Sequence, residues 1–177
     1  VVVCTASAVL AEWGFQALCK QKITISDLSA AVTGLLLALN LPASVTWWQA
    51  IIGSVIAVVV VKGLFGGIGK NFANPAITAR IILLLAFSAS VGAAVQPVIV
   101  DATSTATPLT ILKLDYGILP SLFEMMIGLR GGAIGETCSL ALILGGVYLM
   151  IRKVITWHTP VIFVGCVFLF TLILNGS

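Results

Sequence analysis

Three long stretches without any charged residue constrain the fold of this chain more than any other feature. They lie between Asp27 and Lys62, between Arg80 and Asp101, and after Lys153. Only 8% of the 177 residues are charged and 60% are apolar, whereas a soluble globular domain has about 25% charged residues. A helix needs about 20 apolar residues to cross a bilayer, so each stretch has room for at least one crossing. The composition therefore predicts an all-α, polytopic membrane protein.

Polar and turn-forming residues divide the chain into apolar segments of two lengths. Two pieces, 28–42 and 121–129, are short; at 1.5 Å per residue the first reaches only about 21 Å, less than the bilayer core. The longer predicted helical segments are 1–18, 46–62, 75–95, 134–151 and 158–174. We expect one transmembrane domain over 1–177, with a polar loop at about 96–120. Because apolar segments lie directly at both ends, we expect the chain to be part of a longer protein.

The basic residues predict the orientation of these segments. If the piece 28–42 crosses the bilayer fully, Lys113 and Arg130 fall on one side and all other basic residues fall on the opposite side, namely Lys20, Lys22, Lys62, Lys70, Arg80, Arg152 and Lys153. Loops rich in lysine and arginine face the cytoplasm, so the loop at 96–120 is expected on the outer side. A net charge of +3 that comes from residues flanking membrane segments gives no reason to expect nucleic-acid binding.

The outer loop contains DATSTATPLT, residues 101–110, which places five hydroxyl side chains and one acid within ten residues. Serine and threonine in turns bond their own backbone, so a solvated loop explains this composition. Neither composition nor spacing makes Thr107 a better nucleophile than Thr103.

Two acids in or beside apolar segments are candidate functional residues. Glu12 lies inside the segment 1–18, and an acid at the bilayer centre costs at least about 2.5 kcal/mol and marks a functional site by default. Glu12 either takes part in cation transport, or it only looks buried because the sequence begins a few residues before it. Glu136 opens the segment 134–151, where a carboxylate suits the helix dipole or contacts a cofactor or an ion.

Other reactive residue types favour structural roles. Four scattered cysteines without a C-x-x-C pair indicate apolar packing. His158 is the only histidine and lies next to Trp157, so we expect an interfacial residue and no metal site. The stretch GLFGGIGKN, 63–71, lacks the P-loop pattern, because Leu64 stands in place of its first glycine and Asn71 follows Gly69-Lys70. Its glycines therefore predict a tight turn or a close contact between helices.

Four stretches together resemble one known family. They are TGLLLALNLP (33–42), FGGIGKNFANPAITAR (65–80), DATSTATPL (101–109) and GAIGETCSLALILGGVYLM (132–150), and they occur in this order. They closely resemble the D subunit of the Rnf electron-transport complex and its homologue, the B subunit of the sodium-pumping NADH:quinone oxidoreductase. The resemblance implies an inverted-repeat helical bundle with short half-spans, to which 28–42 and 121–129 correspond.

The resemblance also implies a covalent cofactor. In this family a flavin mononucleotide (FMN) is joined through its phosphate to a threonine, which follows an acid, a few small residues and Ser-Gly-Ala. The corresponding residues here are Asp101, Ser104, Ala106 and Thr107, with Thr107 as the attachment site. Thr105 stands where the family usually has glycine, which leaves the acceptor hydroxyl in place but affects the pattern that a separate flavin transferase would recognise.

The resemblance, taken together with the positions of the charged residues, suggests further roles. Lys113 and Arg130, the two outer basic residues, are expected to offset the phosphate charge, and Glu136 to contact the cofactor. The chain would relay electrons in a complex that couples ferredoxin or NADH oxidation to movement of sodium ions or protons, with Glu12 in the ion pathway. Its partners would be the other subunits, the flavin transferase and the lipid bilayer of a bacterial or archaeal cytoplasmic membrane. A second flavin site would lie in segments beyond this sequence.

Two alternatives stay open at this point. In the first, the chain is a redox subunit, either the D subunit or its quinone-reductase relative. In the second, it is a non-redox channel or transporter of similar architecture, in which the hydroxyl-rich loop has no special role.

Overall fold

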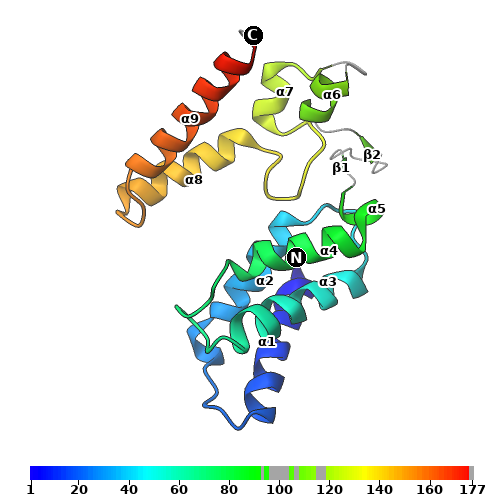
Figure 1. Ribbon diagram of the computed structural model, residues 1–177, viewed down its shortest axis with the longest axis vertical. Coiled ribbons are helices and arrows are strands. Elements are labelled where there is room, and N and C mark those ends of the chain that lie inside the picture. The colour runs from blue at the N-terminus through cyan, green and yellow to red at the C-terminus, as the bar shows by residue number, and fades with distance from the viewer. Residues whose placement is uncertain (93, 96–103, 106–107, 115–118, 176–177) are drawn as a thin grey trace. The chain divides into compact units, whose positions relative to one another are not determined.

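The computed structural model describes residues 1–92, 94–95, 104–105, 108–114 and 119–175. Its ribbon is mostly helical (Figure 1), which confirms the predicted helical class. The chain divides into two compact units, Val1–Cys138 and Ser139–Ser177. One feature was not predicted: a two-residue antiparallel pair between β1 (Ala94–Val95) and β2 (Ser104–Thr105). The description as one domain stays a prediction.

The first unit begins with a helical bundle. Its elements are α1 (Val2–Leu18), a short 3-10 turn η1 (Ile25–Asp27), α2 (Ser29–Asn40), α3 (Trp47–Val55), a π-helix η2 (Ile56–Gly63) that continues α3, α4 (Pro75–Ala86) and α5 (Ser88–Val91). Two shorter helices follow, α6 (Pro108–Leu114) and α7 (Leu122–Ile127). The second unit consists of α8 (Ser139–Ile151) and α9 (His158–Asn175), and the Trp157 and His158 rings stack between them at 4.0 Å.

Local capping explains where several helices begin. Thr46 and Gln49 form a reciprocal capping box at the start of α3, which satisfies backbone N–H groups that have no partner inside the helix. At α4 the Asn74 Oδ1 atom accepts from the N–H of Ala76 at 3.0 Å, and Pro75 occupies the first turn. Asparagine at the N-cap and proline in the first turn are both favoured at the beginning of a helix.

Two predicted helices are shorter than expected. The segment 75–95 is not one continuous helix: α4 ends at Ala86, Phe87 leaves the helical conformation, and only the short α5 follows. Ser90 of α5 bonds the Phe87 carbonyl and the side chain of Gln49. Such side-chain bonds compete with a continuous helix. The segment 134–151 becomes helical only at Ser139. Residues before it form a loop instead, in which the N–H groups of Ile134 and Gly135 donate to the carbonyls of Leu41 and Leu39 at 3.2 and 2.8 Å.

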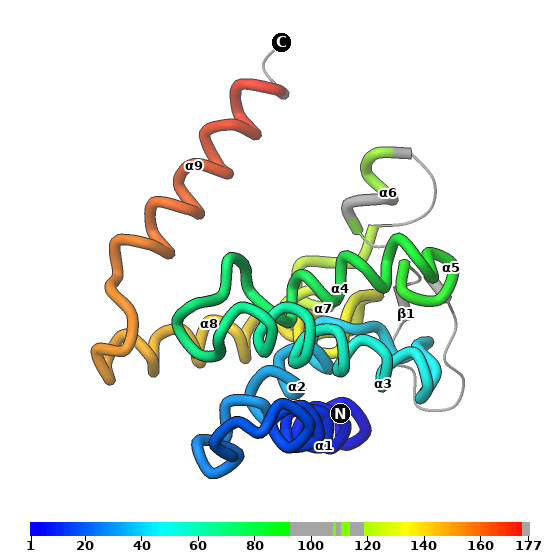
Figure 2. Tube along the Cα trace, turned by 60° about the horizontal axis from the view of Figure 1, so that its bottom comes forward, coloured from blue at the N-terminus to red at the C-terminus, as the bar shows by residue number. Residues whose placement is uncertain are grey.

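Small residues allow the helices of the first bundle to approach closely. Figure 2 shows α1 and α2 side by side. A Cβ on Gly34 of α2 would lie 2.7 Å from the Cys4 carbonyl oxygen and 2.8 Å from the Ala8 Cβ of α1. The buried core is correspondingly rich in alanine; its larger cluster consists of Cys4, Leu37, Ala38, Leu41, Ala50, Ala57, Ala76, Ala79, Leu83 and Val91. Helix interfaces formed by glycine and alanine let the two backbones approach closely, and they are typical of helices packed in membranes.

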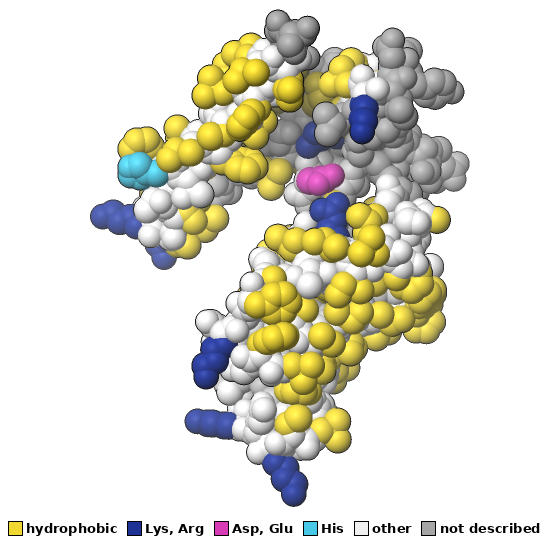
Figure 3. All heavy atoms as spheres, in the orientation of Figure 1, with side chains coloured by type: hydrophobic (Ala, Val, Ile, Leu, Met, Phe, Trp, Pro, Cys, Tyr) yellow, Lys and Arg dark blue, Asp and Glu magenta, His cyan; other side chains and the backbone are white. Residues whose placement is uncertain are grey.

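The outer surfaces of both units are apolar. Figure 3 shows hydrophobic side chains spread over the visible face of the bundle and over the α8–α9 pair. Within the part of the chain that the structure describes, no helix has both the length and the apolar character needed to cross a membrane.

The contact at Gly34 yields a test of the fold. We expect Gly34→Ala to lower the free energy of unfolding by about 1–3 kcal/mol, because the added methyl group forces α1 and α2 apart. Gly14→Ala in α1 is the matched control: nothing lies within 4 Å of its added Cβ, so it should raise stability by about 0.5–1 kcal/mol through helix propensity. Denaturant unfolding of both variants checks this. Equal effects of the two substitutions would show that the close approach at Gly34 is not a constraint.

Candidate functional site

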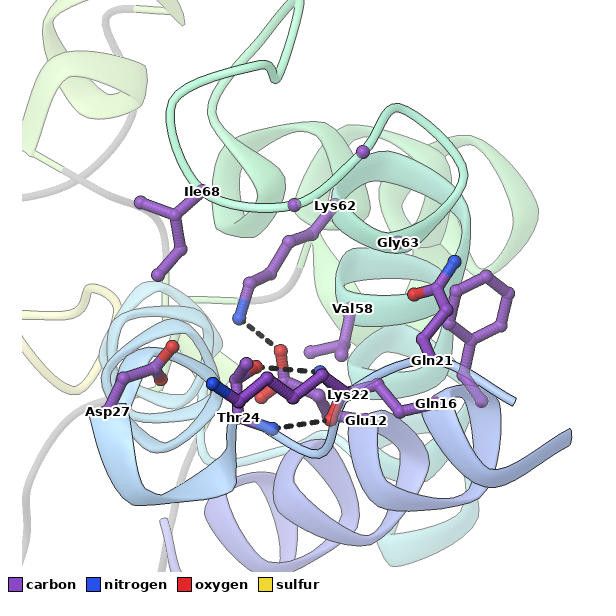
Figure 4. A pocket seen from close by; sticks show the side chains of 13 residues that line it. Glu12, Gln16, Gln21, Lys22, Thr24, Asp27, Val58, Lys62, Gly63 and Ile68 are labelled. Carbon is purple, nitrogen blue, oxygen red and sulfur yellow. Dashed lines mark hydrogen bonds and ion pairs between the residues drawn. The ribbon is translucent and has the colours of Figure 1, made fainter. Parts of the chain in front are cut away.

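A buried ion pair joins α1 to the π-helix η2. Glu12 of α1 is 5% exposed and Lys62 of η2 is 4% exposed, and Lys62 Nζ lies 2.5 Å from Glu12 Oε1 (Figure 4). The same ammonium donates to Ser29 Oγ, the first residue of α2, at 2.5 Å. The second carboxylate oxygen, Glu12 Oε2, is buried and has no hydrogen-bond partner among the described residues. Three elements of the bundle therefore meet at one charged cluster.

The local structure that presents Lys62 is unusual. Residues 56–63 form a π-helix, and bonds of five-residue spacing continue into the following turn, from the N–H of Leu64 to the Val59 carbonyl and from the N–H of Gly67 to the Lys62 carbonyl. Segments of this kind are rare, and they are frequent at functional sites. The wider turn of a π-helix changes which side chains face the neighbouring helix. In η2 the Lys62 side chain points toward Glu12 of α1.

A second layer of polar contacts surrounds the pair. Gln16 is buried and closes a two-way bond with Thr24: its Nε2 donates to Thr24 Oγ1 and its Oε1 accepts from the Thr24 N–H, both at 2.9 Å (Figure 4). Ser29 Oγ donates to Asp27 Oδ1 at 2.5 Å, and the Ser29 N–H donates to the same oxygen at 2.8 Å. These contacts hold the loop between α1 and α2 against the ion pair.

The environment of Asp27 favours its charged form. Hydrogen bonds from the hydroxyl and then the N–H of Ser29 hold the pKa of the Asp27 carboxyl below its ordinary value, and the Lys62 ammonium adds to this effect. Because the folded-state pKa is lowered, the stability that Asp27 contributes is present above its unfolded pKa and is lost as the pH falls through the folded one. At neutral pH an ionised carboxylate therefore stands beside the Lys62–Ser29 contact.

A pocket of about 420 Å³ opens onto the ion pair. Glu12, Asp27, Lys22 and Lys62 line it, together with polar groups of the α1–α2 loop and the glycine turn after η2 (Figure 4). A water molecule takes up about 30 Å³ in the liquid, so the volume suits several waters or a small hydrated ion. The two acids and two lysines make the lining neutral overall.

The glycine turn has the geometry that the sequence predicted. Gly66, Gly67 and Gly69 have φ angles of +96°, +89° and +80°, a region that side chains other than glycine rarely adopt. Gly63, Gly66 and Gly67 form part of the pocket wall.

The predicted flavin loop lies mainly outside the described residues. Asp101, Ala106 and Thr107 are among the residues whose placement is not described, and of Ser104 only the backbone, in β2, is described. Helix α6 begins directly after Thr107, at Pro108, and Lys113 in its last turn is exposed. The attachment site therefore stays a prediction.

Arg130 and Glu136 belong to one local loop. The Arg130 guanidinium donates to the carbonyls of Thr137 and Glu136, at 3.1 and 2.7 Å, and Glu136 Oε1 accepts from the Ala133 N–H at 3.0 Å. Because α8 begins at Ser139, the interpretation of Glu136 as a first-turn residue of that helix is wrong: it closes the preceding loop. The expected contacts of both residues with a cofactor stay predictions.

Sequence reasoning singles out Glu12 but misses its partners. The sequence pattern places Lys62 at a solvated boundary of its segment, whereas the structure buries it, and no pattern points to Ser29 or Asp27. A usable signal exists, because Glu12 and Lys62 are isolated charges in apolar segments, and a buried carboxylate requires a compensating charge. Among the described residues no group of three acid, histidine or cysteine side chains is placed to hold a metal ion.

The pair yields a stability prediction. Removal of one partner leaves a buried, uncompensated charge, so Glu12→Gln and Lys62→Met should each lower the free energy of unfolding by about 3–5 kcal/mol. The double variant should lose clearly less than the sum, which a double-mutant cycle measures. Lys22→Met is the control, an exposed lysine of the same pocket, with an expected change within about 0.5 kcal/mol. Additive losses at Glu12 and Lys62 would contradict a direct interaction.

Comparison with known proteins places the chain in a family. All of residues 1–177 match the model of the NQR2, RnfD, RnfE family. The chain is 42% identical over 178 residues to the D subunit of the Na⁺-translocating ferredoxin:NAD⁺ oxidoreductase complex of Acetobacterium woodii, covering 99% of this chain and 56% of that protein. It is 37% identical over 182 residues to the D subunit of the proton-translocating ferredoxin:NAD⁺ oxidoreductase complex of Clostridium ljungdahlii, covering 97% and 55%.

A third relative is more distant. The D subunit of the ion-translocating oxidoreductase complex of Escherichia coli is 32% identical over 202 residues, covering 92% of this chain and 57% of that protein. The chain thus spans about half the length of the curated relatives it matches. The family suggested by the four sequence stretches is confirmed, and the chain belongs to the NQR2, RnfD, RnfE family.

Proposed function

We propose that this chain is part of a D-type subunit of an ion-translocating ferredoxin:NAD⁺ oxidoreductase complex. The observation that carries the proposal is the 42% identity over 99% of the chain with a relative of that name. The apolar composition and the charge-free stretches support a place in a bacterial or archaeal cytoplasmic membrane. The other subunits of the complex would be its permanent partners.

Within that complex, the chain would relay electrons through a covalent FMN on Thr107. This role is supported by the stretch DATSTATP, which has an acid, a serine and an alanine at the expected positions before the threonine. A flavin changes between one- and two-electron states, which lets it connect donors and acceptors of different kinds. A flavin transferase would form the phosphoester at the Thr107 hydroxyl.

Of the two basic residues expected near the phosphate, Lys113 is the better candidate. Its ammonium is exposed on α6, the helix that starts immediately after Thr107. The Arg130 guanidinium already donates to two backbone carbonyls of its own loop. An exposed cation close in sequence can offset the phosphate charge with little reorganisation.

We assign ion transport to the Glu12 cluster. The buried carboxylate has one oxygen without a partner among the described residues, and it lines a pocket; ionisable groups in such apolar bundles mark ion pathways. The relatives from A. woodii and C. ljungdahlii are named for different ions, Na⁺ and protons. Either cation can compensate a carboxylate.

Flavin attachment gives the first functional test. The chain would be purified from cells that contain the transferase, denatured and examined on a gel for flavin fluorescence. We expect a fluorescent band that Thr107→Ala abolishes, because the acceptor hydroxyl is lost, whereas Thr103→Ala and Thr110→Ala keep it. A dark wild-type band would reject the redox function and favour a channel or transporter.

Ion coupling gives the second test. In the assembled complex, Glu12→Gln should slow ion-coupled turnover at least about tenfold, which corresponds to about 1.4 kcal/mol, while the flavin fluorescence of the band stays unchanged. Glu124→Gln is a matched control: this exposed acid forms the capping box of α7 with Ser121, and glutamine supports the same motif. Ion uptake by inverted vesicles during turnover is the measurement. Coupling that is unaffected by Glu12→Gln would remove Glu12 from the pathway.

A further inference from the structure

We propose that the Lys62 ammonium is a displaceable counter-cation of Glu12: it neutralises the carboxylate while the site is empty, and a small monovalent metal cation replaces it there. This inference rests on the proposed role of Glu12 in ion transport. It assigns a role to Lys62, a residue that the family comparison and the sequence patterns leave without one. Lys62 is then a positioning residue, which acts on the ion through Glu12.

The first argument is the charge balance of the cluster. Glu12 and Lys62 are both at least nine-tenths buried and in direct contact, so the pair is neutral as it stands. Adding a second cation next to the ammonium would place like charges within a few ångströms in a medium of low polarity, which is strongly unfavourable. A cation can therefore enter only if the ammonium leaves.

The second argument is the set of oxygens around the ammonium. Lys62 Nζ lies 2.5 Å from Glu12 Oε1 and 2.5 Å from Ser29 Oγ. Glu12 Oε2 adds a buried oxygen that no described group uses. Hard cations bind carboxylate and hydroxyl oxygens. The ammonium thus occupies a point where oxygens converge, and it leaves one oxygen of Glu12 unused, which a metal cation bound by both carboxylate oxygens would engage.

The third argument is that a displaced ammonium has a place to go. Lys62 lines the pocket of about 420 Å³, and so does Asp27, whose ionised carboxylate already attracts Lys62. Lysine has a flexible four-carbon stem, and the Lys62 residue lies at the end of the π-helix, beside the glycine turn. The side chain can swing from Glu12 into this pocket without unfolding a helix. Lys22 also lines the pocket, so its charge opposes the swing and Asp27 favours it.

The proposal predicts opposite effects for two substitutions of Lys62. Lys62→Met removes the competing charge and leaves Glu12 in need of a cation, so cation affinity should rise. Lys62→Arg keeps the charge but offers a planar fork that binds both carboxylate oxygens, so cation affinity should fall.

The experiment uses the full-length protein in its assembled complex. The carboxyl reagent dicyclohexylcarbodiimide reacts with protonated carboxyl groups in apolar surroundings, and mass spectrometry measures its addition at Glu12 as NaCl is raised at constant ionic strength. Bound Na⁺ protects the carboxylate. Relative to wild type, we expect the half-protecting Na⁺ concentration to fall at least about tenfold in Lys62→Met. It should rise about tenfold in Lys62→Arg; tenfold corresponds to about 1.4 kcal/mol. Glu12→Gln is the control that removes the labelled group.

The possible outcomes separate the two proposals. The same half-protecting concentration in wild type, Lys62→Met and Lys62→Arg would overturn the displacement proposal, and Lys62 would be a structural partner only. If Lys62→Met fails to fold, the Lys62→Arg variant decides alone: a half-protecting concentration equal to that of wild type would overturn the displacement proposal. Labelling that responds to pH but not to Na⁺ in every variant would also overturn it, because the proton would be the only ion at Glu12. The role of Glu12 itself is tested separately by coupled turnover in Glu12→Gln.

Discussion

The cost of burying one carboxylate organises the first helical unit. Glu12 cannot remain ionised among apolar helices unless an opposite charge is close, and Lys62 supplies that charge from a segment 50 residues later in the chain. Ser29 then connects the ammonium to α2 and to Asp27. Because the cluster draws on α1, α2 and η2, the packing of these three elements and the position of the pocket all depend on the same contact. The close approach of α1 and α2 at Gly34 serves the same end, since it brings the start of α2 within reach of the pair.

The positions of helices followed from the sequence where a local cause determines them. The first helix ends at Leu18 as expected, Asn74-Pro75 begins α4, and the glycine turn lies where its pattern placed it. In each case a cap, a proline or a glycine acts through neighbouring residues. The family also followed from sequence, because it rests on four collinear stretches.

Features that depend on residues far apart in the chain could not be predicted from the sequence. Phe87 interrupts α4 partly because Ser90 bonds Gln49, about 40 residues earlier, and α8 starts late because Ile134 and Gly135 bond the end of α2. The valine-rich stretch before Lys62 carries no sequence signal for a π-helix, and the consequence of that helix, the burial of Lys62, reversed the expectation for that residue. Of the candidate site, the carboxylate was predictable and its counter-charge was not.

Helix α2 illustrates how a half-length helix can end among apolar residues. The last carbonyls of a helix lack partners within it. Here the Leu39 carbonyl accepts from the Gly135 N–H, and the carbonyl of Leu41, the extended residue just after α2, accepts from the Ile134 N–H. The other end of the helix begins at Ser29, in contact with Lys62. A helix of 12 residues is about 18 Å long and stiff. Helix α2 is therefore a rigid element whose two ends bond to different parts of the unit. A shift of the loop at 130–138 along the axis of α2 would be transmitted to the Ser29 hydroxyl, which accepts from the buried Lys62 ammonium.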